Sequence, residues 1–385
     1  MDKIFENPEI EEFFMPYIER SFPSQKDFGD NFVNGVKNWW FPSEEINQVC
    51  SEDVLWILDL EFGIKCGLKC QYCFRYDDNR DNNIKPSKQR NPLSLSEWHN
   101  LIDQACECGV KTVKLIGAGE FFEDSNFMSA LRYLTDKGIK VVLFTSGYVL
   151  TDEEKIKRLH GMSPDEIIDY LYINGHSVFI KADSFKPAVM DKIVQTPDFT
   201  ERRNIILAKL LEKGFTKETP TRLGFEVQVN VYTLPELRDL DKLKHYLNIY
   251  SDMVTSMPCG VYNIRKERGE SIDITLDQKS KLYEDVYNQN IRFDISFNGL
   301  SPFIGGLRCT QLGYGLYINV VGDAYACPGC FDKIGNIRES KLKELWESHL
   351  QRKKYQNERY ICPPRENADI TPTRMYKTVQ TKLRR

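Results

Sequence analysis

The sequence contains no long apolar segment and no excess of basic residues, and both absences narrow the possible functions. No stretch of 18 apolar residues occurs in the 385-residue chain, so no transmembrane helix is expected. Lysine and arginine (52) do not outnumber aspartate and glutamate (56), and the net charge of −4 predicts no basic surface for nucleic acid. Residues 1–19 are acidic and contain Pro8 and Pro16, unlike a signal peptide. We therefore expect a cytoplasmic protein that binds neither membranes nor nucleic acid.

The 11 cysteines are an odd number gathered mainly into two groups, which suits a disulfide-linked secreted protein poorly. The first group is Cys66, Cys70 and Cys73, directly after an apolar run at 54–60. Three thiolates on so short a loop are able to bind one cubane-type iron–sulfur cluster and to leave one iron without a protein ligand. The alternative is a structural zinc site or three unrelated thiols, but zinc needs a fourth nearby ligand and the next histidine is His99.

The second group lies near the C-terminus and has four members: Cys309, Cys327, Cys330 and Cys362. Residues 314–319 and 324–326, on either side of a turn at 321–323, predict a β-hairpin that leads into the central pair of cysteines. Spacing alone allows these four thiols to bind either zinc or an iron–sulfur cluster.

From residue 52 onward, short β-rich runs alternate with longer helical ones, which predicts an α/β fold with a parallel sheet. The expected strands are 54–60, 111–116, 140–145, 170–181, 223–231 and 253–257. The expected helices include 95–107, with Ser94 or Ser96 as its cap, and 342–349 near the C-terminus. Six parallel strands with helices outside suggest a partial (β/α)6 barrel, whose reactive groups belong at the C-terminal ends of the strands.

The first cysteine motif, in which the aromatic Tyr72 precedes the last cysteine, resembles the signature of the radical S-adenosylmethionine (SAM) enzymes. The resemblance implies that the amino and carboxylate groups of SAM bind the open iron of a [4Fe–4S] cluster on Cys66, Cys70 and Cys73. One electron, from a donor such as flavodoxin or ferredoxin, would then cleave SAM to a 5'-deoxyadenosyl radical that takes a hydrogen atom from substrate.

The second cysteine group, with the nearby residues 335–337 and 342–346, resembles the twitch or SPASM extensions of the same family. These extensions carry auxiliary clusters, and four cysteines imply one auxiliary [4Fe–4S] cluster. The expected division of the chain is a cap at 1–51, the radical SAM core at 52–265, a linker helix at 266–293, the auxiliary-cluster α+β domain at 294–370 and a basic tail at 371–385.

Polar residues at the predicted strand ends are the candidates for binding SAM. The turn Gly117-Ala118-Gly119-Glu120 is similar to the family's Gly-Gly-Glu-Pro motif, which holds the SAM amino group, with Ala118 in place of one glycine and Phe121 in place of the proline. Small residues let a backbone approach a ligand, and the carboxylate of Glu120 is able to meet an ammonium group.

Later strand ends add three further candidates. Ser146 could bond the ribose or the carboxylate of SAM, and Lys181 could pair with the carboxylate. Polar residues at every second position of one strand, Glu226, Gln228 and Asn230, are expected to face the barrel interior. Asn230 is the predicted ribose contact.

Cys259 follows the sixth predicted strand at the barrel mouth, where a thiol could return a hydrogen atom to a substrate radical, as radical SAM epimerases of sugars are thought to do. An inert buried thiol is the alternative. We expect an oxidoreductase or epimerase of a small polar molecule such as a sugar, an aminoglycoside or a cyclitol. A peptide- or protein-modifying enzyme and a zinc-binding scaffold without activity are the competing interpretations.

Overall fold

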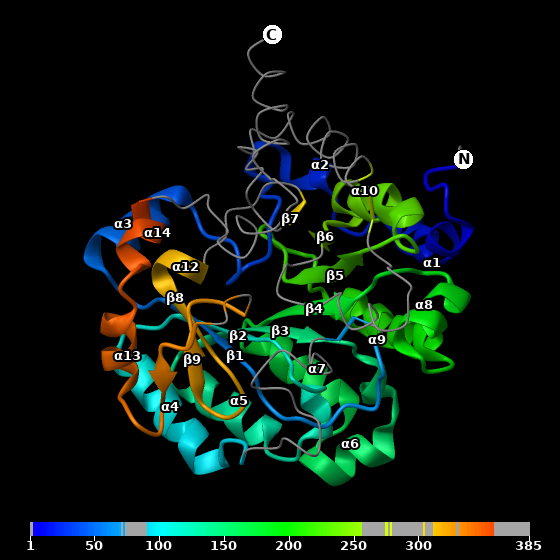
Figure 1. Cartoon of the computed structure of the whole chain (residues 1–385). Helices are drawn as coiled ribbons and strands as arrows, with labels where there is room; N and C mark the ends of the chain where they lie inside the picture. The colour runs from blue at the N-terminus through cyan, green and yellow to red at the C-terminus, as the bar shows by residue number, and fades with distance from the viewer. Residues whose placement is uncertain are drawn as a thin grey trace.

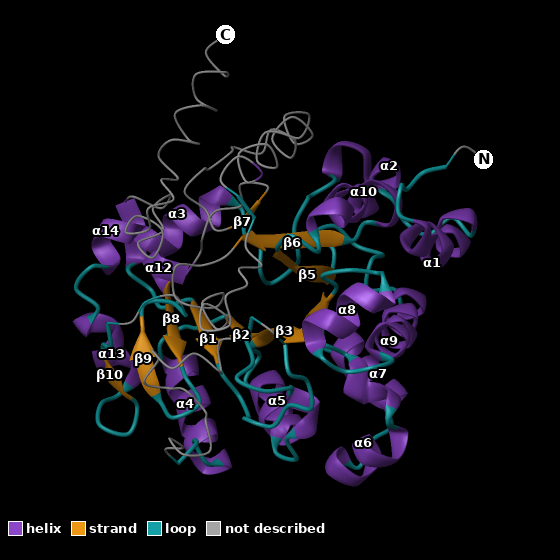
Figure 2. Cartoon of the chain, turned by 45° about the vertical axis from the view of Figure 1, so that its right-hand side comes forward, coloured by secondary structure: helices purple, strands orange, loops and turns teal. Residues whose placement is uncertain are grey.

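A curved sheet organises the protein, and the computed structural model describes residues 3–70, 72–73, 91–255, 274–275, 278, 303–304, 311–328, 330 and 332–357. The strand order within these residues is β10-β9-β8-β1-β2-β3-β4-β5-β6-β7. The strands are β1 Ile57–Leu60, β2 Thr112–Leu115, β3 Lys140–Thr145, β4 Ser177–Lys181, β5 Leu223–Val229, β6 Tyr250–Thr255, β7 Phe303–Ile304, β8 Gly315–Ile318, β9 Asp323–Tyr325 and β10 Gly335–Asn336. The sheet curves so that β5 and β6 lie across from β1 and β2 (Figures 1 and 2).

Strands β1 to β6 are parallel and stand next to one another in chain order. Helices in the connections return the chain along the outer side of the sheet (Figure 1). They are α4 Leu95–Glu107, α5 Phe127–Asp136, α6 Glu153–His160, α7 Pro164–Ile173, α8 Pro187–Val194, α9 Phe199–Lys213 and α10 Leu237–Leu247. This is the partial (β/α)6 barrel that the sequence predicted.

The two faces of the sheet differ in character. The outer face packs against the helices in the main apolar core, where Val113, Val141 and Phe225 are fully buried. On the inner face, a separate apolar cluster consists of Val36, Trp39, Val142, Phe179 and Tyr250, with Phe144 packed against it. We call this set the inner apolar cluster. The inner apolar cluster closes the end of the interior at the N-terminal side of the strands. Polar inner-face residues come after the cluster residues along the strands, nearer to the C-terminal strand ends.

The C-terminal region joins the barrel sheet directly. The predicted hairpin is confirmed: β8 and β9 are antiparallel, and Gly322 adopts the positive φ (88°) that its turn requires. The sequence did not predict that β8 also pairs in parallel with β1, from Ile57 opposite Gly315 to Leu60 opposite Ile318. Helices α12 Gln311–Tyr314, α13 Leu342–Ser348 and α14 Arg352–Asn357 accompany the hairpin, and α13 matches the predicted helix.

One predicted strand was wrong over its first half. Residues 170–181 were expected to be extended, but α7 continues to Ile173 and β4 begins only at Ser177. The reason is the start of the helix: the Ser163 side chain accepts from the Glu166 amide in a capping box, and Pro164 occupies the first turn. This local start signal outweighs the β preference of the aromatic residues that follow.

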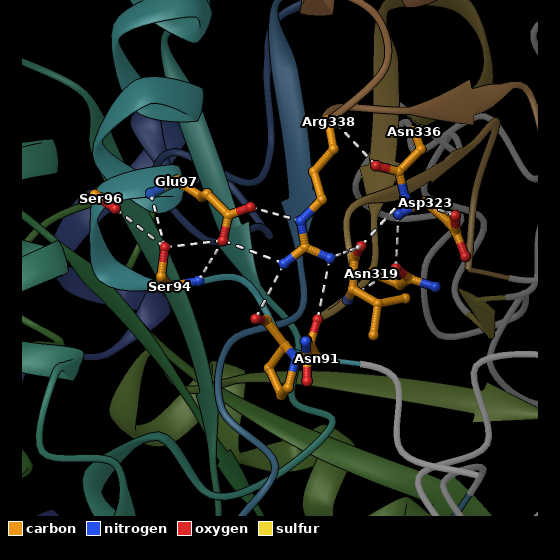
Figure 3. A network of polar contacts seen from close by, with 10 residues as sticks. Asn91, Ser94, Ser96, Glu97, Asn319, Asp323, Asn336 and Arg338 are labelled. Atoms are coloured by element: carbon orange, nitrogen blue, oxygen red, sulfur yellow. Dashed lines mark hydrogen bonds and ion pairs between the residues drawn. The ribbon is translucent and has the colours of Figure 1, made fainter.

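An arginine fastens the C-terminal region to the core (Figure 3). The Nε of Arg338 donates to Oε1 of Glu97 at 2.5 Å, and its Nη2 donates to Oε2 of the same carboxylate at 3.1 Å. The guanidinium also donates to the backbone oxygens of Asn91 and Pro92, which precede α4. Glu97 in turn accepts from the amide of Ser94, the predicted cap of α4. The carboxylate of Glu97 therefore holds both the C-terminal region, through Arg338, and the start of α4, through Ser94.

The N-terminal segment packs beside the barrel through α1 Pro8–Glu19, α2 Gln25–Phe28 and α3 Ser43–Glu52. Asn7 caps the start of α1. Its backbone amide also donates to Asp239 on α10, and its side chain donates to Glu236 in the turn before α10, both at 2.7 Å. Among the described residues, no helix is long and apolar enough to cross a lipid bilayer. Most of the predicted linker helix at 266–293 lies outside the described residues.

Candidate functional site

The first cysteine group lies where the sequence placed it, in the loop that leaves the C-terminal end of β1. Cys66, Cys70 and Cys73 are all half-buried. The loop is held by its own backbone: the Cys73 amide donates to the Cys70 oxygen at 3.1 Å, and the Lys69 amide donates to the oxygen of Val194 at 3.0 Å. The loop is thus anchored to the end of α8 between its cysteines.

The donor set of this loop suits an iron–sulfur cluster, since its three thiols come from eight consecutive residues at a strand end. Burial raises the pKa of Cys70 to about 12, while the positive charge of Lys181 acts in the opposite direction. A thiol in this setting becomes a thiolate only beside a strong positive centre, which an iron–sulfur cluster supplies. No three His, Cys, Asp or Glu side chains of the described residues gather around a point that one metal ion could occupy.

The glycines of the next strand end are required by the cluster loop itself. The Glu120 amide donates to the oxygen of Lys65 at 2.8 Å, so the turn after β2 and the cluster loop share a backbone hydrogen bond. A Cβ on Gly119 would lie 2.4 Å from that same oxygen, and a Cβ on Gly117 would lie 2.1 Å from the Gly119 oxygen. The predicted close approach is therefore made by a neighbouring backbone.

Glu120 and Ser146, predicted separately as SAM contacts, come together at the ends of β2 and β3. The Thr145 hydroxyl donates to Oε1 of Glu120 at 2.5 Å, and the Ser146 amide donates to Oε2 at 3.0 Å. The Ser146 hydroxyl also donates to Oε2. Burial raises the pKa of Glu120, and the bonds from Ser146 and Thr145 oppose that rise. These three donors hold the carboxylate in one orientation.

Lys181 and Tyr72 meet through a residue that the sequence analysis did not select. The Lys181 Nζ lies 2.6 Å from Oδ2 of Asp183 and 4.3 Å from the centre of the Tyr72 ring. The Tyr72 hydroxyl donates to the same oxygen of Asp183 at 2.5 Å. Asp183 is fully buried, and its other oxygen accepts from the Gln228 amide at 2.7 Å. The lysine predicted to meet the SAM carboxylate is therefore already oriented by a carboxylate of the protein.

Asn230 has a local role in the structure. Its Oδ1 accepts from the Tyr232 amide at 2.9 Å, and its Nδ2 donates to the Gln228 oxygen at 3.0 Å. The residue is fully buried in this turn after β5. Polar side chains of this size commonly shape turns in this way. The prediction of a ribose contact at Asn230 therefore receives no support from its geometry, whereas Glu226 and Gln228 are partly exposed on the inner face as expected.

Two further acidic residues at the site, besides Asp183, were missed. Glu123 accepts from the Tyr148 hydroxyl at 3.0 Å and from the Gly67 amide at 3.3 Å, and so ties the cluster loop to the ends of β2 and β3. Glu61, directly after β1, accepts from the Tyr317 hydroxyl and from the Val320 amide. The only sequence signal for Glu61 was its position at a strand end.

The second cysteine group is described in part. The sulfurs of Cys327 and Cys330 lie 3.4 Å apart just after β9, close enough to serve one metal centre. A hydrogen bond from Cys327 lowers the pKa of Cys330, while burial acts in the opposite direction. Cys309 and Cys362, and also Cys259, lie outside the described residues, so their predicted roles stay predictions.

Two protein families match separate parts of the chain. Residues 60–223 match the radical SAM superfamily, and residues 309–366 match SPASM, an iron–sulfur cluster-binding domain. The first match begins at the end of β1 and includes the three cysteines of the cluster loop. The second includes all four cysteines of the C-terminal group.

Individual relatives are distant. The chain is 22% identical over 307 residues to an AdoMet-dependent heme synthase of Methanosarcina barkeri, covering 74% of this chain and 79% of that one. It is 23% identical over 133 residues to a SAM-dependent nucleotide dehydratase of Selenomonas ruminantium. That alignment covers 41% of the dehydratase. Its fold is similar to that of Streptococcus suis SuiB bound to its precursor peptide SuiA, with a TM-score of 0.52, 14% identity and coverage of 79% and 67% of the two chains.

A radical SAM domain binds a [4Fe–4S] cluster together with SAM, and a SPASM domain binds auxiliary iron–sulfur clusters. The three-cysteine loop after β1, the carboxylate at the end of β2 and the cysteine pair after β9 agree with both domain assignments. The chain therefore contains a radical SAM domain at residues 60–223 and a C-terminal SPASM iron–sulfur domain at residues 309–366.

Proposed function

We propose that this protein uses the SAM-derived 5'-deoxyadenosyl radical to take a hydrogen atom from a small polar substrate, such as a sugar, an aminoglycoside or a cyclitol. The observation that carries the proposal is the lining of the barrel interior. Its inner face bears ionisable side chains on several strands, among them Asp59 on β1, Lys114 on β2, Glu226 on β5 and Asp252 on β6. Below them the inner apolar cluster closes the interior. A small polar molecule suits such an interior better than an apolar one does.

In this proposal Cys66, Cys70 and Cys73 bind the SAM-associated cluster. Glu120, oriented by Thr145 and Ser146, accepts from the SAM amino group, because the hydroxyl and amide donors of its neighbours hold the carboxylate in place. Lys181 meets the SAM carboxylate, with Asp183 fixing its ammonium group from the other side.

The auxiliary cluster is proposed to use Cys309, Cys327, Cys330 and Cys362. Cys259 is proposed as the hydrogen-atom donor if the reaction is an epimerisation. An external electron carrier, such as flavodoxin or ferredoxin, would supply the reducing electron.

The test is to incubate the reduced protein and SAM with candidate sugars, cyclitols and short peptides in deuterated water, followed by mass spectrometry. Deuterium in a product of otherwise unchanged composition would support epimerisation, and loss of two hydrogens would indicate dehydrogenation. Cys259→Ala is expected to abolish deuterium incorporation in the first case and to have little effect in the second. Turnover of a peptide, with no sugar or cyclitol accepted, would overturn the proposed substrate class.

A further inference from the structure

Five ionisable residues lie on the inner face of the barrel, one each on β1, β2, β4, β5 and β6, and we call them the inner charged layer: Asp59, Lys114, Lys181, Glu226 and Asp252. Asp59 is the register partner of Lys114, and Glu226 is the register partner of both Lys181 and Asp252. Register partners in a parallel sheet project to the same face. Lys181 and Asp252 each follow a member of the inner apolar cluster by two residues, so these two residues lie directly beyond that cluster on the way to the strand ends.

The two lysines of the inner charged layer already have carboxylates beside them. Lys114 lies 3.6 Å from Asp59, and Lys181 lies 2.6 Å from Asp183. This pairing leaves Glu226 and Asp252 as the two carboxylates in excess. When ionised, they give this part of the interior an unbalanced negative charge, which is costly in a low-dielectric surrounding unless a cation joins them.

Asp252 is one of these two excess carboxylates, and among the described residues its surroundings lack a hydrogen-bond donor for one of its oxygens. It is 2% exposed, and its Oδ1 has no hydrogen-bond partner among the described residues. Burial and the adjacent charge of Glu226 raise the pKa of Asp252, and Lys114, on β2, acts in the opposite direction. Strand β2, which carries Lys114, lies across the curved sheet from β6, which carries Asp252 (Figure 2). A buried carboxylate oxygen without a donor marks a place for a hydrogen-bonding group.

The neighbours of Asp252 are accessible from the interior. Glu226 and Gln228 are partly exposed, whereas Phe225 and Val227 on the opposite face of β5 are fully buried. Phe144 on β3 is also partly exposed between buried neighbours, and its ring stacks on Phe179 at 4.5 Å. An aromatic face is suited to an ammonium group and to the C–H face of the ring that carries it.

From this arrangement we propose that Asp252 and Glu226 bind a protonated amino group of the substrate, which makes the substrate an amino sugar or an aminocyclitol. The inference rests on the proposed function, because it names the substrate class of that same interior. The ammonium group would donate to the free oxygen of Asp252 and balance the charge of Glu226. The C–H face of the substrate ring would lie against Phe144.

The test measures binding to the cluster-loaded protein in the presence of SAM by anaerobic calorimetry. The probes are two pairs that differ mainly in amino groups: glucosamine with glucose, and 2-deoxystreptamine with myo-inositol. Each amine is expected to bind at least about tenfold more tightly than its neutral counterpart. Asp252→Asn and Glu226→Gln are expected each to remove most of that preference. The control Asp165→Asn changes an exposed carboxylate on α7 and is expected to leave it intact.

Equal binding of amines and neutral compounds would overturn the inference. An unchanged amine preference in both variants would also overturn it. A loss of SAM affinity as large as the loss of amine affinity would overturn it too, because the two carboxylates would then bind SAM. Glu226→Gln covers the case in which Asp252→Asn does not fold, because Glu226 is partly exposed. Formation of 5'-deoxyadenosine without any amine tests the proposed function separately from the amine site.

Discussion

Gly119 is the closest contact between the turn after β2 and the cluster loop. Gly119→Ala would place a methyl group 2.4 Å from the backbone oxygen of Lys65, so one of the two backbones must shift. We expect this variant to lose SAM affinity by about tenfold or more and to retain less iron, because Glu120 and the cysteine loop are held by that contact. Calorimetry and iron assay measure both effects.

Gly161→Ala is the matched control for this change. Gly161 has a φ of 67° at the end of α6, with no atom near the position of an added Cβ. Alanine there costs about 1 kcal/mol of stability through backbone strain alone. If Gly161→Ala impairs SAM affinity as much as Gly119→Ala does, general destabilisation explains the result and the specific contact does not.

His176 is a fully buried histidine that the fold keeps neutral. Its Nδ1 accepts from the Val141 amide at 3.2 Å, and its Nε2 lies 3.0 Å from the Thr135 hydroxyl. Burial lowers its pKa from 6.5 to about 3, with Lys140 and Arg222 acting in the same direction. Between these two pH values the unfolded chain binds a proton that the folded chain does not.

The free energy of unfolding must therefore fall as the pH drops below about 6.5, by at most about 1.4 kcal/mol per pH unit from this residue. Denaturant titrations at about pH 7 and about pH 5.5 measure the effect. His176→Gln keeps a donor and an acceptor but does not titrate, and we expect its loss of stability over this range to be smaller by about 1 kcal/mol. Equal losses in the two proteins would show that His176 does not carry the pH dependence.

Among the larger elements, α4 and the segment after β10 depend on one ion pair. Hydrogen bonds from Arg338 and from the Ser94 amide lower the pKa of Glu97 to about 2, so the carboxylate stays charged above that pH. The pair is about one-third exposed, so its contribution is about 1 kcal/mol. Arg338→Gln should speed amide hydrogen exchange at the start of α4. Arg338→Lys should speed it by a smaller factor, because lysine keeps the positive charge but lacks the two-pronged guanidinium that bonds both carboxylate oxygens. Unchanged exchange in both variants would contradict this role.

Helices with strong local signals were predictable from the sequence, and one long-range strand pairing was not. Ser94 predicted the start of α4, and the predicted strand 140–145 coincides with β3. The pairing of β8 with β1 joins residues more than 250 positions apart, and no local pattern encodes such a contact. The error at 170–181 arose because aromatic residues in α7 resemble a strand when the capping box at Ser163 is overlooked.

The site could be predicted only as far as its residues lie in motifs. Cys66, Cys70 and Glu120 were selected because they lie in short motifs after strands. Asp183 and Glu123 were missed, since their importance comes from partners contributed by other strands and loops. The local hydrogen bonds of Asn230 also depend on turn geometry that alternation along a strand does not show.

Considered as a whole, the chain brings the cluster loop and the pair Cys327 and Cys330 to one sheet. The strand β1 leads into the cluster loop, and its neighbour β8 leads through β9 to the cysteine pair. Glu61, at the start of the cluster loop, accepts from Tyr317 on β8 and from Val320 in the hairpin turn. This shared edge of the barrel gives the SPASM region a fixed place beside the cluster loop.

The most direct measurement is to incubate the anaerobic, reconstituted protein with SAM and dithionite and to quantify 5'-deoxyadenosine and methionine by chromatography. Samples should contain about eight irons per chain, as expected for two [4Fe–4S] clusters. We expect the wild-type protein to form both products in equal amounts, and Cys66→Ala, Cys70→Ala and Cys73→Ala to form neither. If the iron-loaded wild-type protein forms neither product, or contains zinc in place of iron, the account is contradicted.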